Sequence, residues 1–539
     1  MRRISFFLFV SILALAITLP AFAAVQNVKV GGDVTVRHLW RRAYDLNAKN
    51  DSDTYNGGLF GPIDGDAAGE TARMADIYNW FMEQVRIRVD AELTDNVSGH
   101  IELLNQRDAD SPNVGTQGSA LATNGAGTAV SGVATGSGGA PSGANDAFDV
   151  TLNKAYITVK EFLYGPVTLS AGRMDYEMND GFVIGKNQVG QPDLQNSIAA
   201  DEFTQSHAFD SVLLNVDLQP WMIDFFTAKI SEDSIIGSDD EDLFAINVSR
   251  TFDTWDSKVA GYIAVDNNNS TADGAATTLA RATRLYDYGI HITTTPIEHL
   301  RVNTEFVAQF GKEGGFGTAL TNGAGTLGGV DVADFTFNGN VKQDIRAFAS
   351  DIRAEYDVTA LPWPSTLGIE HVFYSGEDPN EHGNSSNFRP MHRGKFHSAI
   401  REFQGTFYIP ALGVTPGSTN QHQFILDMGF SPFNNPDIKF FTRFLSFWFH
   451  HVPVGDVTDQ IAGDNSGGRR RHIGEEVDFQ LSWAYTEDLT FDVLYAMFVP
   501  GSYFEGGAAI TSLSSPAAGF TQANDVAQEL VSSVTLNFG

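Results

Sequence analysis

Residues 474–499 read GEEVDFQLSWAYTEDLTFDVLYAMFV and contain two stretches in which apolar residues alternate with mostly polar ones. One stretch runs from Val477 to Tyr485, the other from Leu489 to Met497, and a Glu487-Asp488 turn separates them. Because alternate side chains of a strand point to opposite faces, each stretch predicts a strand with one large apolar face. The second sheet of a soluble sandwich could cover that face, and so could membrane lipid.

The N-terminal residues predict export from the cytoplasm. Two arginines, Arg2 and Arg3, precede an apolar run at residues 4–19, and Ala21-Phe22-Ala23 follows it. This order is typical of a secretory signal peptide, so we expect residues 1–23 to be removed. An uncleaved anchor helix is the alternative, but the run is short for a membrane span. In residues 24–539, strand-like stretches alternate with turn-like and loop-like stretches throughout, and no domain linker interrupts them, so we predict a single domain.

The composition argues against several functions. The formal net charge of -32 argues against nucleic-acid binding, which requires a basic surface. The sequence has no cysteine, which excludes disulfides and thiolate metal sites. The histidines of residues 382–397 lack the spacing of a zinc motif. We therefore predict neither an enzyme nor a bound cofactor.

Two kinds of connection alternate along the chain. Eight are short and rich in turn-forming residues, near 95–96, 163–166, 219–220, 253–256, 295–298, 359–365, 432–437 and 487–488. Nine are long and polar, near 41–76, 108–147, 176–206, 231–241, 267–283, 312–343, 376–418, 452–473 and 500–525. These seventeen connections predict about eighteen strands.

Such strands suit a transmembrane antiparallel β-barrel. They average about 9–14 residues, as tilted strands that cross a bilayer do, and an even count with short and long connections is typical of outer-membrane barrels. The predicted location is the outer membrane of a Gram-negative bacterium, with short periplasmic turns and long extracellular loops. The Gly-, Ala-, Ser- and Thr-rich tract 113–147 is expected to be an external loop, and a constriction inside the lumen is the alternative.

Several motifs resemble the alginate-export family of outer-membrane barrels. Residues 153–185 contain an Ala155-Tyr156 strand, a Gly165-Pro166 turn and the pairs Gly172-Arg173, Asp180-Gly181 and Ile184-Gly185 in the family's order. Further steps follow at Phe209-Asp210, at residues 374–378, at residues 473–478 and at residues 498–501. The resemblance implies a monomeric eighteen-stranded barrel that exports a polysaccharide. In members that export alginate, it implies an arginine-lined pore.

The alternation also predicts which side chains line the pore. Charged side chains that face lipid at mid-membrane are destabilising, so they are expected to point inward. The expected pore-lining residues are Arg86, Arg88, Asp90, Glu92, Arg173, Arg301, Glu305, Asp351, Arg353, Glu355, Asp478, Gln480 and Asp492. Arg173 shares the parity of apolar residues, so this expectation requires a bulge near Gly172. Residues 438–449 are apolar on both faces, which leaves the orientation of Lys439 and Arg443 open.

The favoured function is an outer-membrane channel for a polysaccharide or another hydrophilic solute. The predicted lining mixes arginines with carboxylates, so a general diffusion porin for small solutes is an alternative. A barrel that scaffolds a multi-protein conduit is another. The expected partners are outer-membrane lipid and lipopolysaccharide, the solute, and the barrel assembly machinery, because Phe538 places an aromatic residue near the C-terminus.

Overall fold

The computed structural model describes most of the strands and several connections. The described residues are 27–43, 77–108, 150–186, 208–231, 240–269, 283–313, 326–327, 330–331, 343–376, 384–400, 419–451, 471–502 and 525–539. The predicted signal peptide, residues 1–23, and the tract 113–147 lie outside them. Within the described residues, no helix has the length and apolar character needed to cross a membrane.

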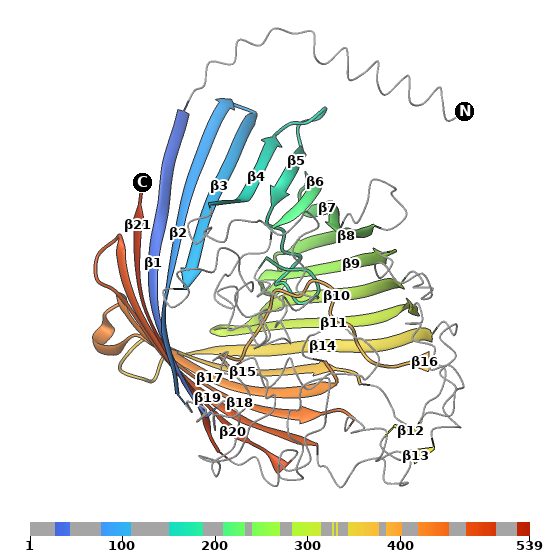
Figure 1. Cartoon of the computed structure of the whole chain (residues 1–539). Coiled ribbons are helices and arrows are strands. Elements are labelled where there is room, and N and C mark those ends of the chain that lie inside the picture. Colours follow the sequence, from blue (N-terminus) through green and yellow to red (C-terminus); the bar gives the residue numbers. More distant parts are fainter. Residues whose placement is uncertain are drawn as a thin grey trace.

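Eighteen long strands form one antiparallel wall (Figure 1). They are β1 (Asn27–Arg42), β2 (Ile77–Thr94), β3 (Val97–Asp108), β4 (Thr151–Val159), β5 (Val167–Met174), β6 (Phe209–Leu218), β7 (Trp221–Ser231), β8 (Glu241–Phe252), β9 (Ser257–Asn268), β10 (Thr283–Ile297), β11 (Leu300–Glu313), β14 (Gln343–Val358), β15 (Ser365–Tyr374), β17 (Gln421–Phe430), β18 (Ile438–Phe449), β19 (His472–Ala484), β20 (Leu489–Pro500) and β21 (Ala527–Phe538). The two-residue strand β16 (Asn384–Ser385) pairs parallel with β14 and makes a nineteenth member of the sheet. Strands β12 (Thr326–Leu327) and β13 (Val330–Asp331) pair only with each other.

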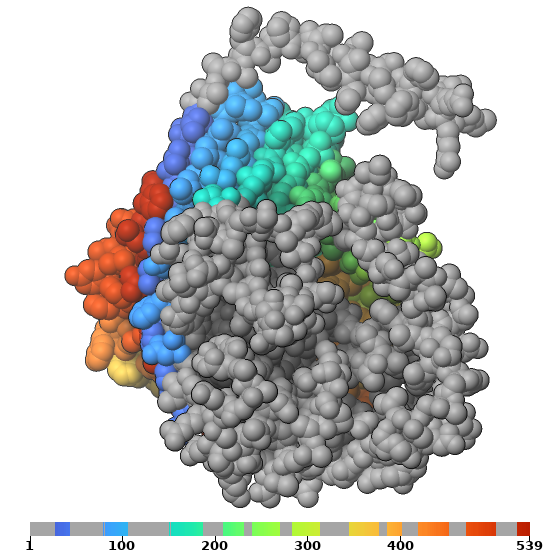
Figure 2. All heavy atoms as spheres, in the orientation of Figure 1, coloured from blue at the N-terminus to red at the C-terminus, as the bar shows by residue number. Residues whose placement is uncertain are grey.

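The wall closes on itself. Strand β1 pairs with β2 along one edge and with β21 along the other, from Gly32 opposite Phe538 to Arg42 opposite Gln528. Figure 2 shows this seam on the outer surface, where the blue N-terminal strands lie beside the red C-terminal strand. A backbone in lipid has no water to bond, so closure satisfies the polar groups that an open sheet edge would expose. The predicted all-β, eighteen-stranded transmembrane barrel is confirmed.

The two faces of the wall differ as the alternation predicts. In β19, Phe479, Leu481 and Trp483 are 37–42% exposed on the outer face, whereas Glu476 and Asp478 are at most 3% exposed on the inner face. The long strands among the described residues form a single closed wall with no second sheet packed on its outer face, so the sandwich alternative for residues 477–497 is wrong. The inner face of β18 carries the buried Phe447, and its outer face carries the exposed Trp448.

The connections lie at opposite rims. The short turns, two of which contain the one-turn helices η3 (Thr254–Asp256) and η4 (Pro432–Asn434), lie at the same rim as the start of β1 and the end of β21 (Figure 1). The longer connections leave the other rim. Parts of two of them turn back into the barrel, and they build the candidate site.

Candidate functional site

Two segments from the long-loop rim pack inside the barrel. The first inner segment, residues 175–186, follows β5, and the second inner segment, residues 384–400, lies between β15 and β17. Both contain residues that are almost fully buried, among them Phe182 and Ile184 in the first and Phe388 and Ile400 in the second. The described part of the lumen is therefore not an open tube.

The two inner segments bind each other through their backbones. Gly185 N–H donates to the His392 carbonyl at 2.8 Å, and Gly394 N–H donates to the Gly181 carbonyl at 2.8 Å. The chains approach so closely that a Cβ on Gly185 would lie 2.6 Å from the Gly394 Cα. Glycine is required at such an approach because any side chain would collide with backbone.

Hydrogen bonds also fix the second inner segment to the wall. The Gln309 side chain of β11 donates to the Arg389 carbonyl at 2.8 Å and accepts from the Arg389 N–H at 2.9 Å. On the other side of the lumen, Glu476 of β19 accepts from the Ser398 hydroxyl at 2.6 Å and from the Ile400 N–H at 3.1 Å. Buried polar groups need such partners, so the segment has a defined position across the lumen.

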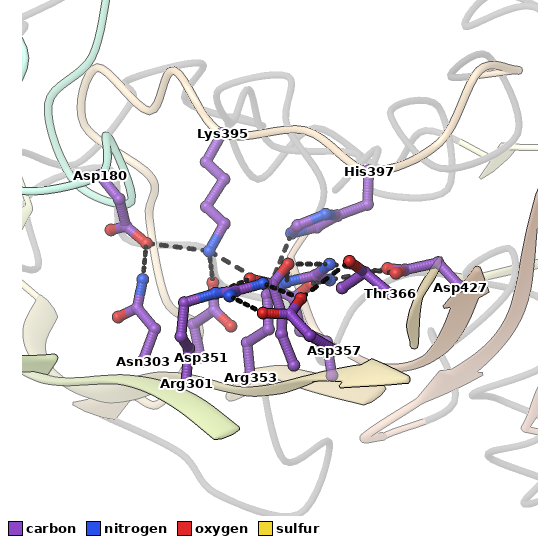
Figure 3. Close-up of polar contacts among 12 residues, drawn as sticks. Asp180, Arg301, Asn303, Asp351, Arg353, Asp357, Thr366, Lys395, His397 and Asp427 are labelled. Carbon is purple, nitrogen blue, oxygen red and sulfur yellow. Dashed lines mark hydrogen bonds and ion pairs between the residues drawn. The ribbon is translucent and has the colours of Figure 1, made fainter. Parts of the chain in front are cut away.

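A dense network of charges lies between the wall and the second inner segment (Figure 3). Arg353 of β14 lies 2.7 Å from a carboxylate oxygen of each of Glu355, Glu370 and Asp427. Arg301 extends the network toward the short-turn rim, where it pairs with Asp357 at 2.7 Å. The guanidinium groups are thus surrounded by carboxylates.

Lys395 connects this network to both inner segments. Its Nζ lies 2.6 Å from Asp351, 3.2 Å from Glu370 and 3.0 Å from Asp180 of the first inner segment. Burial alone would lower the pKa of Lys395, but the three carboxylates raise it above its ordinary value, so the ammonium stays charged. Figure 3 shows Lys395 and the neighbouring His397 extending from the segment toward the wall.

The neutral ring of His397 completes the network. Its Nε2 lies 3.3 Å from Glu370 Oε1, yet burial lowers the pKa of the ring to about 3. The Glu370 carboxylate opposes this shift, while the Lys395 and Arg443 cations reinforce it. Near neutral pH the ring is therefore a neutral hydrogen-bonding group.

A second network lies on β1, β2 and β3. Asp33 pairs with Arg86 at 3.0 Å and with Arg88, and Arg88 also binds Glu102 at 2.9 Å. Asp33 and Glu102 are at most 2% exposed, whereas the two arginines are 27–33% exposed. The arginines therefore reach the lumen with part of their surface while their charge is compensated.

Most of the predicted pore-lining residues share the inner face of the wall. The strand pairing places Asp90 and Glu92 on the same face as Arg86 and Arg88. It places Arg301, Glu305, Asp351 and Glu355 on the same face as Arg353. It also places Gln480 and Asp492 on the same face as Asp478. Glu305, Asp351 and Asp478 are buried, whereas Asp90, Glu92 and Gln480 are exposed.

Arg173 lies on the outer face of the wall, contrary to the prediction that it lines the pore. The register of β5 with β4 and β6 is continuous, so the bulge expected near Gly172 is absent. Arg173 lies opposite Asp210, which is 61% exposed, and not on the face of the buried Ser211. It points outward near the strand end and forms a 2.9 Å ion pair with Asp210. Arg173 could point inward only if the strand had a bulge near Gly172, so the prediction that Arg173 lines the pore is wrong.

Several residues of the site were not predicted from the sequence. Glu370 and Asp427 lie on strands, where the same alternation marks them as inward. Asp180, Lys395 and His397 lie on connections, which have no period to read. The one available signal for Asp180 is the Asp180-Gly181 step of the family motif, which falls within the first inner segment.

Three clusters in the described residues combine one histidine with two carboxylates at spacings that a metal ion could bridge. Within each cluster, the potential ligand atoms lie within 4.8 Å of one another. The clusters are Asp180, His291 and Glu305; Glu241, Asp266 and His392; and Asp351, Glu370 and His397.

The closed barrel, with polar networks and two segments inside it, has the architecture of an outer-membrane β-barrel protein. The sequence model of the alginate export family matches residues 66–514. The chain belongs to the alginate export family and is an outer-membrane channel. No curated protein sequence matches significantly.

Several solved Pseudomonas aeruginosa structures are similar to this chain at low sequence identity. OccK8 (OprE) is 11% identical, with a TM-score of 0.46 over 95% of this chain and 99% of that one. OccK11 (OpdR) is 8% identical, with a TM-score of 0.44 over 94% and 96% of the two chains. OccK2 (OpdF) in complex with glucuronate is 9% identical, with a TM-score of 0.45 over 95% and 99%.

Proposed function

We propose that this chain is a passive channel in the outer membrane of a Gram-negative bacterium and that it passes a neutral or cationic hydrophilic solute, such as a neutral saccharide. The observation that carries the proposal is the excess of carboxylates over cations in the charge network between the wall and the second inner segment. The family supports a polysaccharide or a related solute, and the charge selects among such solutes.

Carboxylates exceed cations in the network of Figure 3. The three cations are Arg301, Arg353 and Lys395. The six carboxylates that pair with them are Asp180, Asp351, Asp357, Asp427, Glu355 and Glu370. If all six carboxylates are ionised and His397 is neutral, three positive and six negative charges give these nine groups a formal charge of -3. A polyuronate carries a negative charge on each sugar and would be repelled, while neutral sugars would pass without this penalty.

Planar-bilayer recording tests both parts of the proposal. We expect an open-channel current, and in a potassium chloride gradient we expect a reversal potential of the sign for weak cation selectivity. Liposome swelling then compares a neutral oligosaccharide with an oligouronate of equal length, and the neutral sugar should enter faster. A barrel that carries no current would overturn the channel, and strong anion selectivity with faster oligouronate entry would overturn the proposed solute class.

A further inference from the structure

Three side chains converge inside the lumen at the edge of the charge network. Asp180 comes from the first inner segment, His291 from β10 and Glu305 from β11. His291 and Glu305 are directly opposite each other in the strand ladder. One potential ligand atom of each residue lies within 4.8 Å of those of the other two.

Four side-chain atoms of these residues have no hydrogen-bond partner among the described residues. They are Asp180 Oδ1, Glu305 Oε2 and both ring nitrogens of His291, and His291 Nε2 lies 3.8 Å from Asp180 Oδ1. Glu305 is 1% exposed and His291 is 4% exposed. A buried polar group without a partner costs about 1–3 kcal/mol, and more if it is charged, so several such atoms in one place favour the binding of an ion there.

The other oxygen of each carboxylate is already held in place. Asp180 Oδ2 accepts from the Asn303 amide at 2.8 Å and from Lys395 Nζ at 3.0 Å. Glu305 Oε1 accepts from the Tyr262 hydroxyl. Such outer hydrogen bonds orient carboxylates that bind a metal, and here they leave one oxygen of each residue directed at the histidine.

The other two clusters are each supplied in part with partners. The Lys395 ammonium lies between Asp351 and Glu370, so a cation already occupies the position that an ion would take. In the remaining cluster, Glu241 Oε2 accepts from the Asn268 amide at 2.7 Å, although Asp266 Oδ1 has no hydrogen-bond partner among the described residues. In the cluster of Asp180, His291 and Glu305, by contrast, all three residues have such an unpartnered atom.

We propose that Asp180, His291 and Glu305 bind a divalent metal ion of the class that includes Zn²⁺ and Mn²⁺. An imidazole nitrogen with two carboxylate oxygens is a ligand set that such ions accept, whereas Ca²⁺ and Mg²⁺ prefer oxygen ligands alone. A proton shared between the carboxylates would compensate part of their charge but would not employ the histidine. The ion links the first inner segment to β10 and β11 and adds two positive charges beside the charge network of Arg353 and Lys395.

Metal binding to the purified, chelator-treated barrel in detergent tests the site. Isothermal titration with zinc chloride and with manganese chloride should give one tight site per barrel. Glu305→Gln and His291→Gln should each weaken it at least a hundredfold, and Tyr262→Phe should weaken it about tenfold to a hundredfold because the ligand loses its outer hydrogen bond. The matched control Asp266→Asn, in a neighbouring cluster, should leave it unchanged.

Cobalt substitution provides a test on the wild-type chain in case a variant does not fold. Co²⁺ bound by a nitrogen and carboxylate oxygens in a low-coordinate site should give visible absorption bands that added Zn²⁺ abolishes. Heat-dependent mobility in gels should show each variant to be a closed barrel. The proposal is overturned if the wild-type barrel binds no ion, or if binding is unchanged in both Glu305→Gln and His291→Gln.

Discussion

Replacing Lys395 with methionine should loosen the second inner segment and make the channel more cation-selective. The substitution keeps most of the aliphatic side chain and removes the ammonium that lies 2.6 Å from Asp351 and 3.2 Å from Glu370. These carboxylates are at most 3% exposed, and Lys395 itself is 16% exposed. The variant therefore removes the cation that pairs with the buried Asp351, whereas Glu370 keeps its 2.7 Å pair with Arg353.

The expected magnitude follows from burial. Removing one partner of a buried ion pair destabilises by about 3–5 kcal/mol, which changes the equilibrium between docked and released segment by a factor of a hundred or more. The contacts of Ser398 and Ile400 with Glu476 remain, so we expect frequent excursions of the segment and not its permanent release. At a separation of about 10 Å, a unit charge changes the free energy of a passing monovalent ion by about 0.4 kcal/mol in water, so we expect about a twofold change in the local concentration of each ion.

Single-channel recording with reversal potentials measures both effects. Lys395→Met should show a noisier current with higher-conductance events and a reversal potential shifted toward cations. Lys186→Met is the matched control, because it removes a lysine from the first inner segment whose 3.2 Å pair with Glu177 is 45% and 29% exposed. Such an exposed pair contributes at most about 1 kcal/mol. If the two variants behave alike, or if Lys395→Met changes nothing, the anchoring role of Lys395 is refuted.

Three further substitutions test the wall and the network. Arg41→Met should destabilise the barrel by about 3–5 kcal/mol in urea unfolding, because Arg41 and Glu529 form a 2.6 Å ion pair across the β1–β21 seam and both side chains are 1% exposed. The double variant Arg41→Met with Glu529→Met should recover much of the lost stability. Leu426→Arg should destabilise by about 2–4 kcal/mol when the barrel unfolds from lipid vesicles, because Leu426 is 55% exposed on the outer face, and no loss would contradict that orientation. Because burial holds the pKa of His397 near 3, below its ordinary 6.5, its contribution to stability is complete above about pH 6.5 and decreases as the pH falls toward 3. Wild type should thus lose more thermal stability than His397→Gln between about pH 7 and pH 4.5, and a smaller loss in wild type would show that the ring is held protonated.

The wall could be predicted from the sequence because a membrane barrel imposes a strict period of two. At Asp478 and Phe479 that period alone separates a side chain that is 3% exposed from one that is 37% exposed. The exception is informative. Arg173 lies at the end of β5, where its carboxylate partner Asp210 lies on the same outer face. An ion pair at a strand end can therefore satisfy an outward arginine, and no bulge is needed to turn it inward.

The inner segments could not be predicted in the same way, because a connection has no period that assigns its side chains to a face. Residues 176–206 and 376–418 read as long polar loops, yet parts of both lie within the barrel. What decides their position is contact with distant strands, such as the bonds of Arg389 with Gln309, 80 positions away in the sequence. Pairings of this kind become visible only when the closed wall brings the strands together.

Charge complementarity explains why the second inner segment enters this lumen. Residues 384–400 carry Arg389, Arg393 and Lys395 and no acidic residue, in a chain with 66 acidic and 34 basic residues. The wall that faces the segment has the opposite bias, with buried carboxylates at Asp351, Glu370, Asp427 and Glu476. Buried carboxylates are strongly destabilising unless cations or hydrogen-bond donors reach them. The segment supplies Lys395 to Asp351 and Glu370 and backbone donors to Glu476, so wall and segment each satisfy charges or polar groups that the other buries. A local reversal of charge therefore distinguishes the second inner segment in the sequence, whereas the first inner segment, with three acidic residues and one lysine, shares the acidic composition of the chain.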